Sequence, residues 1–148
     1  MDELIHNYIL ITTLLAAITA QLLKGLLEAF LQKSFNPGRI LETGGMPSSH
    51  SAAVASLATS MGLYYGWDSP FFTISAVLAV IVIYDATGIR RAAGEHAVVL
   101  NELLEELNHL LEDGFKKQNL KTLLGHTYPQ AAAGIIVGVL FSVAMYYR

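Results

Sequence analysis

Long apolar segments constrain this chain more than any other feature of its sequence. Tyr8 to Leu31 is predominantly apolar, and at about 1.5 Å per residue it is long enough to cross a hydrocarbon core of about 30 Å. Tyr128 to Tyr147 is a second such segment, rich in alanine and glycine. Because lipid offers no hydrogen bonds to the backbone, segments of this kind cross it as helices. The sequence therefore predicts an all-α membrane protein.

The composition agrees with this prediction. Of the 148 residues, 53% are hydrophobic and only 14% are charged, whereas a soluble domain has about 25% charged residues. There is no cysteine, which excludes a disulfide framework and a cysteine-based metal site. The net charge of -3 gives no reason to expect nucleic acid as a partner. We expect one membrane-embedded domain comprising residues 1–148.

Further helices are predicted between the two long segments. The first runs from about Ser48 to Tyr65 and the second from about Phe71 to Tyr84, with a short turn between them. The second is short for a membrane span unless it continues through Asp85 towards Ile89. Arg90 to Lys121 is polar, and within it an amphipathic helix is indicated by apolar residues at helical spacing, namely Val98, Val99, Leu103, Leu107, Leu110 and Leu111. The predicted fold is an integral membrane bundle of about four transmembrane helices plus this amphipathic helix on the cytoplasmic side.

The distribution of charge predicts how such a bundle is oriented. With four spans, residues 32–49 and 85–125 lie on one side of the membrane. That side holds most of the basic residues, namely Lys33, Arg39, Arg90, Arg91, Lys116, Lys117 and Lys121, whereas the other side offers only Arg148 beside Asp2, Glu3 and Asp68. By the positive-inside rule we expect a multi-pass protein of the plasma membrane with both chain ends outside and the two basic loops in the cytoplasm.

Polar residues interrupt the first apolar segment on one side only. Gln21, Lys24 and Glu28 share a helical face. Polar groups at such depth are costly unless they face a bundle interior or a wet cavity, so we expect a polar stripe turned toward an internal site. Snorkelling of Lys24 and Glu28 to the membrane surface is the alternative.

The stretch Gly44 to Ala52 reads as a loop that opens a helix. Gly44 and Gly45 allow a tight turn, and Pro47-Ser48-Ser49-His50 leads into an apolar run. The start of a helix leaves backbone N–H groups unpaired and carries a positive dipole end, which together suit a phosphate. His50, in the first turn, is placed to transfer a proton. The alternative is an ordinary Gly/Pro loop capped by serine.

Two later stretches carry further chemistry, Asp85 to Arg91 and Gly125 to Gln130. Lysine and two arginines beside a helix start would supply the positive field that phosphoryl transfer needs. Two histidines allow one imidazole to attack phosphorus and the other to protonate the leaving oxygen. No carboxylate cluster with metal-ligand spacing accompanies them, so we expect a route with no metal and no cofactor.

These motifs together resemble the divergent branch of the type-2 phosphatidic acid phosphatase superfamily, which also contains vanadium haloperoxidases. The resemblance spans residues 21–138 and rests on Gly-Gly-Met-Pro-Ser-Ser-His-Ser-Ala, Asp-Ala-Thr-Gly-Ile-Arg-Arg-Ala-Ala-Gly, Leu-Asn and Leu-Gly-His-Thr. The tail His126-x3-Gln130-x3-Gly134-x3-Gly138 is similar to the final motif of that superfamily.

The resemblance implies a role for each matching residue. His126 would be the nucleophile and His50 the general acid, and the phosphate would be held by Lys24, Ser48, Ser49 and one of Arg90 or Arg91. Gln21, Gly45 and Gln130 would support the site. The implied activity is hydrolysis of a lipid phosphate or pyrophosphate through a phosphohistidine, on the cytoplasmic side of the membrane.

Several positions depart from the pattern and leave alternatives open. Gln130 stands where an acid should orient His126, so that acid could come from Asp85, which could also cap a helix or hold an arginine in a structural ion pair. His96 is a rival nucleophile because Arg90 stands six residues before it. The two arginines could instead anchor to lipid headgroups.

Other functions and assemblies also stay open. The same basic pocket would serve a catalytically weak protein that binds or moves phospholipids, and a small structural subunit of a larger membrane complex is a third interpretation. Gly134 and Gly138 suit close helix contact, which leaves a homo-oligomer open.

Overall fold

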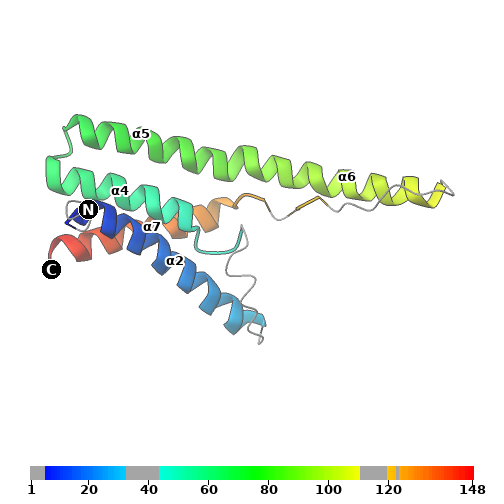
Figure 1. Cartoon of the computed structure of the whole chain (residues 1–148), viewed down its shortest axis with the longest axis horizontal. Helices are drawn as coiled ribbons and strands as arrows, with labels where there is room; N and C mark the ends of the chain where they lie inside the picture. Colours follow the sequence, from blue (N-terminus) through cyan, green and yellow to red (C-terminus); the bar gives the residue numbers. More distant parts are fainter. Residues whose placement is uncertain (1–5, 33–43, 111–119, 123) are drawn as a thin grey trace.

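The computed structural model describes residues 6–32, 44–110, 120–122 and 124–148. Four helices of this part of the chain pack into a bundle, namely α2 (Tyr8–Gln32), α4 (Ser49–Tyr65), α5 (Pro70–Tyr84) and α7 (Tyr128–Tyr146) (Figure 1). Three stretches of the described residues are helical, long and apolar enough to cross a membrane: Tyr8–Phe30, Pro70–Asn108 and Tyr128–Tyr146. The prediction of an all-α membrane bundle is therefore confirmed.

The central helix of the bundle is α4. It packs against α2, α5 and α7, and its 17 residues extend about 26 Å at 1.5 Å per residue. Its buried residues are all small, namely Ser51, Ala52, Ala55, Ser56, Thr59, Ser60 and Gly62. Small residues let helices approach closely where lipid provides no hydrophobic force between them. This explains how a serine-rich helix lies inside a membrane bundle.

The GxxxG pair of α7 faces α4. A Cβ atom on Gly134 would lie 2.3 Å from the carbonyl oxygen of Ser48, and one on Gly138 would lie 2.3 Å from that of Ala52. Further along the same contact, the hydroxyls of Ser56 and Ser142 are 2.7 Å apart. The two glycines are thus used within one chain, and their face of α7 is not available to a second copy.

The third predicted helix ends as an α-helix at Tyr84, but the backbone stays helical beyond it, as the alternative of continuation towards Ile89 allowed. α5 continues through a π-helical turn, η1 (Asp85–Ile89), into α6 (Arg90–Leu110), so that one rod extends far beyond the bundle (Figure 1). The chain contains no proline between Pro70 and Pro129, and η1 keeps the backbone bonded because the Arg90 N–H donates to the carbonyl of Asp85. The polar composition of 90–110 marks departure from lipid, not the end of a helix.

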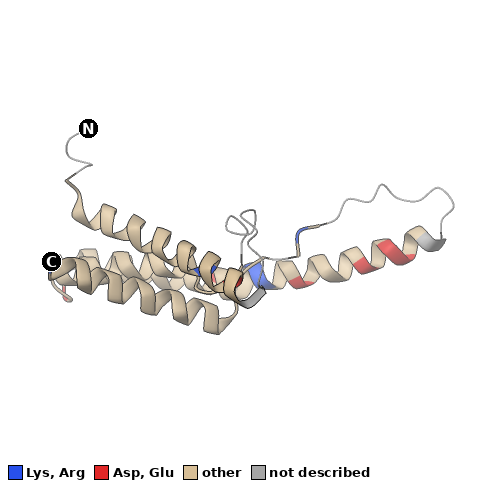
Figure 2. Cartoon of the chain, turned by 90° about the horizontal axis from the view of Figure 1, so that it is seen from below, with Lys and Arg blue, Asp and Glu red and all other residues tan. Residues whose placement is uncertain are grey.

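Charged residues are distributed differently over the bundle and over α6. Figure 2 shows the bundle nearly free of charged residues, with Lys and Arg near its junction with α6 and Asp and Glu along α6. The start of α2 and the end of α7 lie at the opposite end of the bundle (Figure 1). Several residues used for the predicted orientation lie outside the described residues, namely Asp2, Glu3, Lys33, Arg39, Lys116 and Lys117, as does Leu111 of the predicted amphipathic helix.

Candidate active site

Two histidines that are far apart in the sequence meet where α4 and α7 begin. The ring centroids of His50 and His126 are 6.4 Å apart, and the ring planes are tilted by 53°. His50 lies in the first turn of α4 and is exposed, whereas His126 directly precedes the N-cap of α7 and is only 8% exposed. The pair therefore joins a buried imidazole to one that solvent can reach.

The backbone of His126 is anchored to the π-turn. Its N–H donates to the carbonyl oxygen of Ala86 at 2.8 Å. In that turn the Arg90 N–H bonds to Asp85 rather than to Ala86, so the Ala86 carbonyl can serve a neighbouring segment. Gly125 makes the approach possible, because its φ is +78° and a Cβ there would lie 2.5 Å from the backbone nitrogen of Arg91. A π-turn inside a helix is often a functional feature, and this one positions His126.

The segment that leads to His126 runs back along α6. At its start the Asn101 side chain both donates to the carbonyl of Leu120 and accepts from its N–H, each at 3.0 Å. Further on, a Cβ at Gly94 would lie 2.7 Å from the carbonyl of Thr122. Asn101 and Gly94 therefore hold residues 120–122 and the start of 124–126 close against the helix (Figure 1).

α2 contributes a buried amine to the same region. Lys24 is 3% exposed, and its aliphatic stem packs on Gly45, where a Cβ would lie 2.9 Å from Cδ of Lys24 and 2.7 Å from Oε1 of Glu28. Gly45 has a φ of +78°. The polar face predicted for α2 thus meets the glycine loop that precedes α4, and Gln21, one turn before Lys24, is half-buried.

Ser48 caps α4 and joins it to α7. Its side chain is fully buried and accepts from the N–H of Ser51 at 3.3 Å, while its own N–H donates to the carbonyl of Gln130 at 3.1 Å. Ser49, the first residue of α4, is half-buried beside it. The unpaired N–H groups at the start of α4 lie in the same turn as His50.

The side chain of Gln130 has a structural role that was not predicted when it was noted only as a replacement for an acid. Its side-chain carbonyl accepts from the backbone N–H of Thr127 at 3.0 Å as part of a capping box. The Nδ1 atom of His126 is buried and has no hydrogen-bond partner among the described residues. The imidazole is therefore not hydrogen-bonded through Nδ1 to an acid.

Burial is the main influence on the charge of His126, which lies outside the membrane-spanning part of α7. Desolvation lowers the pKa of His126 below the ordinary 6.5, and the nearby charges of His50 and Lys24 lower it further, whereas contacts with the side chain of Gln130 and the backbone of Gly45 raise it. The net effect favours the neutral imidazole at pH 7. A neutral imidazole has the free lone pair that a nucleophile needs.

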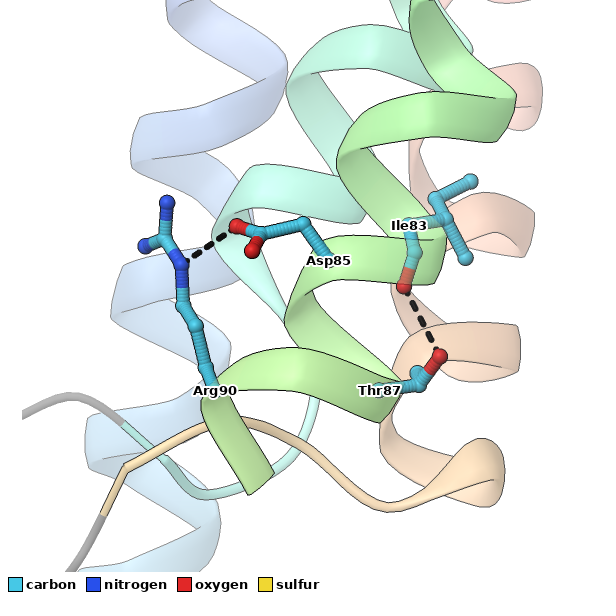
Figure 3. A network of polar contacts seen from close by, with 4 residues as sticks. All are labelled: Ile83, Asp85, Thr87 and Arg90. Atoms are coloured by element: carbon cyan, nitrogen blue, oxygen red, sulfur yellow. Dashed lines mark hydrogen bonds and ion pairs between the residues drawn. The ribbon is translucent and has the colours of Figure 1, made fainter. Parts of the chain in front are cut away.

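The acidic and basic residues at the junction of the π-turn with α6 pair with one another. Asp85 accepts from Nε of Arg90 at 2.5 Å (Figure 3), and Arg91 bonds through its own Nε to Glu95 at 3.1 Å. Both arginine side chains are about half exposed. Of the interpretations left open for Asp85, its contacts correspond to the ion pair with an arginine. His96 is exposed on α6, apart from the paired imidazoles.

The site offers imidazole, amine and helix-start groups rather than a metal cage. Within residues 6–32, 44–110, 120–122 and 124–148, no three His, Cys, Asp or Glu side chains form a group that could hold a metal ion. The arrangement can bind an anion and move a proton next to it. Three supporting features were not predicted from the sequence: the Ala86 carbonyl that binds His126, the two hydrogen bonds between Asn101 and Leu120, and the capping box of α7. Of these, only the capping box has a recognisable sequence pattern, Thr127-x-x-Gln130.

The chain is similar to a known family and to a known membrane protein. The sequence pattern of the Divergent PAP2 family matches residues 5–141. A protein of Bacillus subtilis (strain 168), described as uncharacterized membrane protein YuiD, is 38% identical over 154 residues, which cover 98% of this chain and 98% of that protein. No solved structure matches the chain.

Proposed function

Since this chain belongs to the Divergent PAP2 family, we propose that it is a membrane phosphatase that hydrolyses a lipid phosphate or pyrophosphate through a phosphohistidine. The observation that supports this most is the approach of two imidazoles, His50 and His126, to 6.4 Å at the end of a membrane bundle. A buried lysine next to them adds the positive charge that a phosphate requires.

The proposed reaction has two steps, with His126 as the nucleophile. In the first, a ring nitrogen of His126 attacks phosphorus, the bond from phosphorus to the leaving oxygen breaks, and His50 gives its proton to that oxygen. In the second, water attacks the phosphohistidine, His50 takes a proton from the water, and the phosphorus–nitrogen bond breaks to release phosphate. The lowered pKa of His126 supports this assignment because it keeps the attacking ring neutral.

The phosphate would be held by the groups around the histidine pair. Lys24 supplies a buried cation, and the start of α4 at Ser48 and Ser49 supplies backbone N–H groups and a helix dipole. An arginine at the junction of the π-turn with α6, Arg90 or Arg91, completes the positive set. Gly45, on which the stem of Lys24 packs, and Gln21, one turn before Lys24 on α2, are assigned supporting roles.

A lipid is the preferred substrate because of where the site lies. Exposed apolar side chains of α2 adjoin the level of Lys24, among them Leu23, Leu26 and Leu27. In a membrane this surface faces acyl chains, so a headgroup can reach the site while its chains stay in lipid. We propose that the site faces the cytoplasm of a plasma membrane, as the basic residues predict.

Phosphate release by the purified protein tests the proposal. We expect release from at least one member of a panel of lipid phosphates, and a fall of about 10²- to 10⁴-fold in kcat for His50→Ala, the usual contribution of general acid catalysis. His126→Ala should abolish release, and His96→Ala should leave it unchanged. Full activity in His126→Ala would rule out this mechanism, and loss in His96→Ala would point to the rival nucleophile.

A second function is favoured by one observation. Gln130 forms a capping box and Nδ1 of His126 has no partner among the described residues, so no carboxylate stabilises an imidazolium there. A protein that binds or moves phospholipids without hydrolysing them would need only the basic pocket. It would bind lipid phosphates with no release by the wild-type protein, and His126→Ala would bind as well as wild type.

A further inference from the structure

The ion pair between Asp85 and Arg90 depends on the π-turn. In a regular α-helix, residues five apart point about 140° away from each other, because each residue turns the chain by 100°. Here the Arg90 N–H bonds to the carbonyl of Asp85, so five residues close one turn and the two side chains meet on one side of the helix. Figure 3 shows the carboxylate reaching Arg90 across this turn.

The carboxylate holds only one part of the guanidinium. The bond is made through Nε, and in the part of the chain that the structure describes neither terminal nitrogen of Arg90 has a hydrogen bond. A guanidinium carries five N–H donors in one plane, and its terminal edge can bind two oxygens of a phosphate side by side. Asp85 therefore fixes the side chain and leaves the anion-binding edge unoccupied (Figure 3).

The same π-turn binds the backbone of His126. The Ala86 carbonyl binds the backbone N–H of His126, and Gly125 packs on the backbone nitrogen of Arg91. Arg90 thus stands on the element that positions the proposed nucleophile. The Arg90 and Asp85 side chains are 52% and 31% exposed, and an ion pair with that much water around it adds little to folding stability.

We propose that Asp85 is a positioning residue, which holds Arg90 through Nε so that its terminal edge is presented to the phosphate of the substrate. This inference rests on the phosphate site proposed above. It assigns Asp85 to binding through Arg90, and not to the orientation of His126. An arginine fixed in advance spares the complex the entropy of ordering a long side chain.

Binding of a short-chain lipid phosphate to full-length protein carrying His126→Ala tests the proposal without turnover. Asp85→Ala should raise Kd about three- to tenfold, the cost of ordering one long side chain. Asp85→Asn, which keeps an acceptor for Nε, should restore Kd to within about twofold. Simple electrostatics predicts the opposite sign for Asp85→Ala, because removing a carboxylate strengthens the attraction for an anion.

Arg91 and Glu95 provide the matched control. They form the same Nε-to-carboxylate bond one residue further on, but in the regular part of the helix. Glu95→Ala should leave Kd unchanged or lower it slightly. Arg90→Lys keeps the charge without the fork, so it should weaken binding as much as Asp85→Ala, and it replaces that variant if Asp85→Ala fails to fold.

Two results would overturn the proposal. One is binding by Asp85→Ala as tight as that of its parent or tighter, and the other is unchanged Kd with a lower kcat when Asp85→Ala is made in a chain with His126 intact. Absence of binding in the parent would reject the phosphate site as well. If the wild-type chain hydrolyses no lipid phosphate but Asp85→Ala still weakens binding, the phosphatase function fails and the positioning role stands.

Discussion

Two glycines in and beside the π-turn, Gly88 and Gly125, differ in whether a side chain could be accommodated. Gly125 has a φ of +78° and a Cβ there would collide with the backbone of Arg91, whereas a Cβ at Gly88 would meet nothing within 4 Å. The identity of residue 125 is therefore dictated by conformation and close approach. Residue 88 is not under either constraint.

Replacement of each glycine by alanine tests this difference. Gly125→Ala should lower the free energy of unfolding by about 1–3 kcal/mol, because a left-handed conformation and a backbone clash are both imposed. It should also reduce phosphate release by displacing His126. Gly88→Ala should be neutral or stabilise by up to about 1 kcal/mol, since alanine favours helix. Thermal unfolding in detergent measures both, and equal losses for the two variants would contradict the assignment.

The buried imidazole of His126 should make stability depend on pH. Because its pKa is lowered in the folded protein, the unfolded chain takes up a proton first as the pH falls below about 6.5. Its contribution to stability is present above that pH and is lost below it, by at most about 1.4 kcal/mol per pH unit.

Unfolding midpoints at pH 7.5 and 5.5 measure this effect. The drop between the two values should be smaller in His126→Gln than in wild type, while His96→Gln, on the exposed face of α6, should behave as wild type does. An identical drop in all three proteins would show that His126 does not cause the dependence.

Individual residues show where prediction from sequence stops. His50 and His126 were expected to lie near each other, and their ring centroids are 6.4 Å apart. Their motifs lie at the starts of α4 and α7, which begin at the same end of the bundle. The bond between Asp85 and Arg90 was not predictable from helical spacing, since residues five apart share a face only in a π-turn. Gln130 was interpreted as a substitute for an acid next to His126, although its spacing from Thr127 already indicated a capping box.

At the scale of elements, the contact between α4 and α7 supports the site from behind. Gly134 and Gly138 lie directly against the backbone of α4, so the two helix starts that carry the histidines are held by the tightest packing in the described bundle. A side chain at Gly138 would force these helices apart. Loosening this contact should therefore disturb the histidine pair as well as the fold.

Gly138→Leu tests that coupling. Overpacking of a close contact costs about 1–3 kcal/mol, and phosphate release should fall with stability because the two helix starts separate. Ala144→Leu, on an exposed position of the same helix, should change neither. Loss of release without loss of stability, or the reverse, would show that packing and site are not linked through this contact.

At the same scale, the Asn101 side chain holds the backbone of Leu120 against α6. Asn101→Ala removes both hydrogen bonds to Leu120, so amide hydrogen exchange should quicken in residues 120–126. Phosphate release should fall only modestly, because the bond from His126 to Ala86 remains. Glu102→Ala, at the next residue of the same helix, should leave exchange there unchanged, and equal exchange in Asn101→Ala and wild type would rule out this role of Asn101.

Helix boundaries were predicted well where caps mark them, as at Ser48 and Ser69, whose side chains accept from the third residue beyond. Continuation of α5 towards Ile89 was considered, but its junction with the amphipathic helix α6 was not predicted, because a change from apolar to polar composition resembles the end of a helix. Hydropathy reports where a helix leaves lipid, whereas only a breaker or a cap reports where it ends. The next proline after Pro70 is Pro129.

At the scale of the whole molecule, the site lies at one end of the bundle, and the start of α2 and the end of α7 lie at the other (Figure 1). The loop before α4, the π-turn and residues 124–126 converge at one end, from which α6 projects away. The segments that carry the proposed chemistry thus share one end of the bundle. We propose that this end faces the cytoplasm, because Lys and Arg gather there (Figure 2) and basic residues favour the cytoplasmic side of a membrane.

Single cysteines can determine the orientation, because the chain has none of its own. Asp68→Cys lies in the exposed turn between α4 and α5, and Glu95→Cys lies on the exposed face of α6. In intact cells a thiol reagent that cannot cross the membrane should label position 68 and spare position 95, and lysis should make position 95 reactive. The reverse pattern would place His50 and His126 outside the cell. The phosphatase proposal would survive that result with its substrate taken from the outer leaflet, because the histidine pair and Lys24 depend on the packing of α2, α4 and α7 and not on which compartment they face.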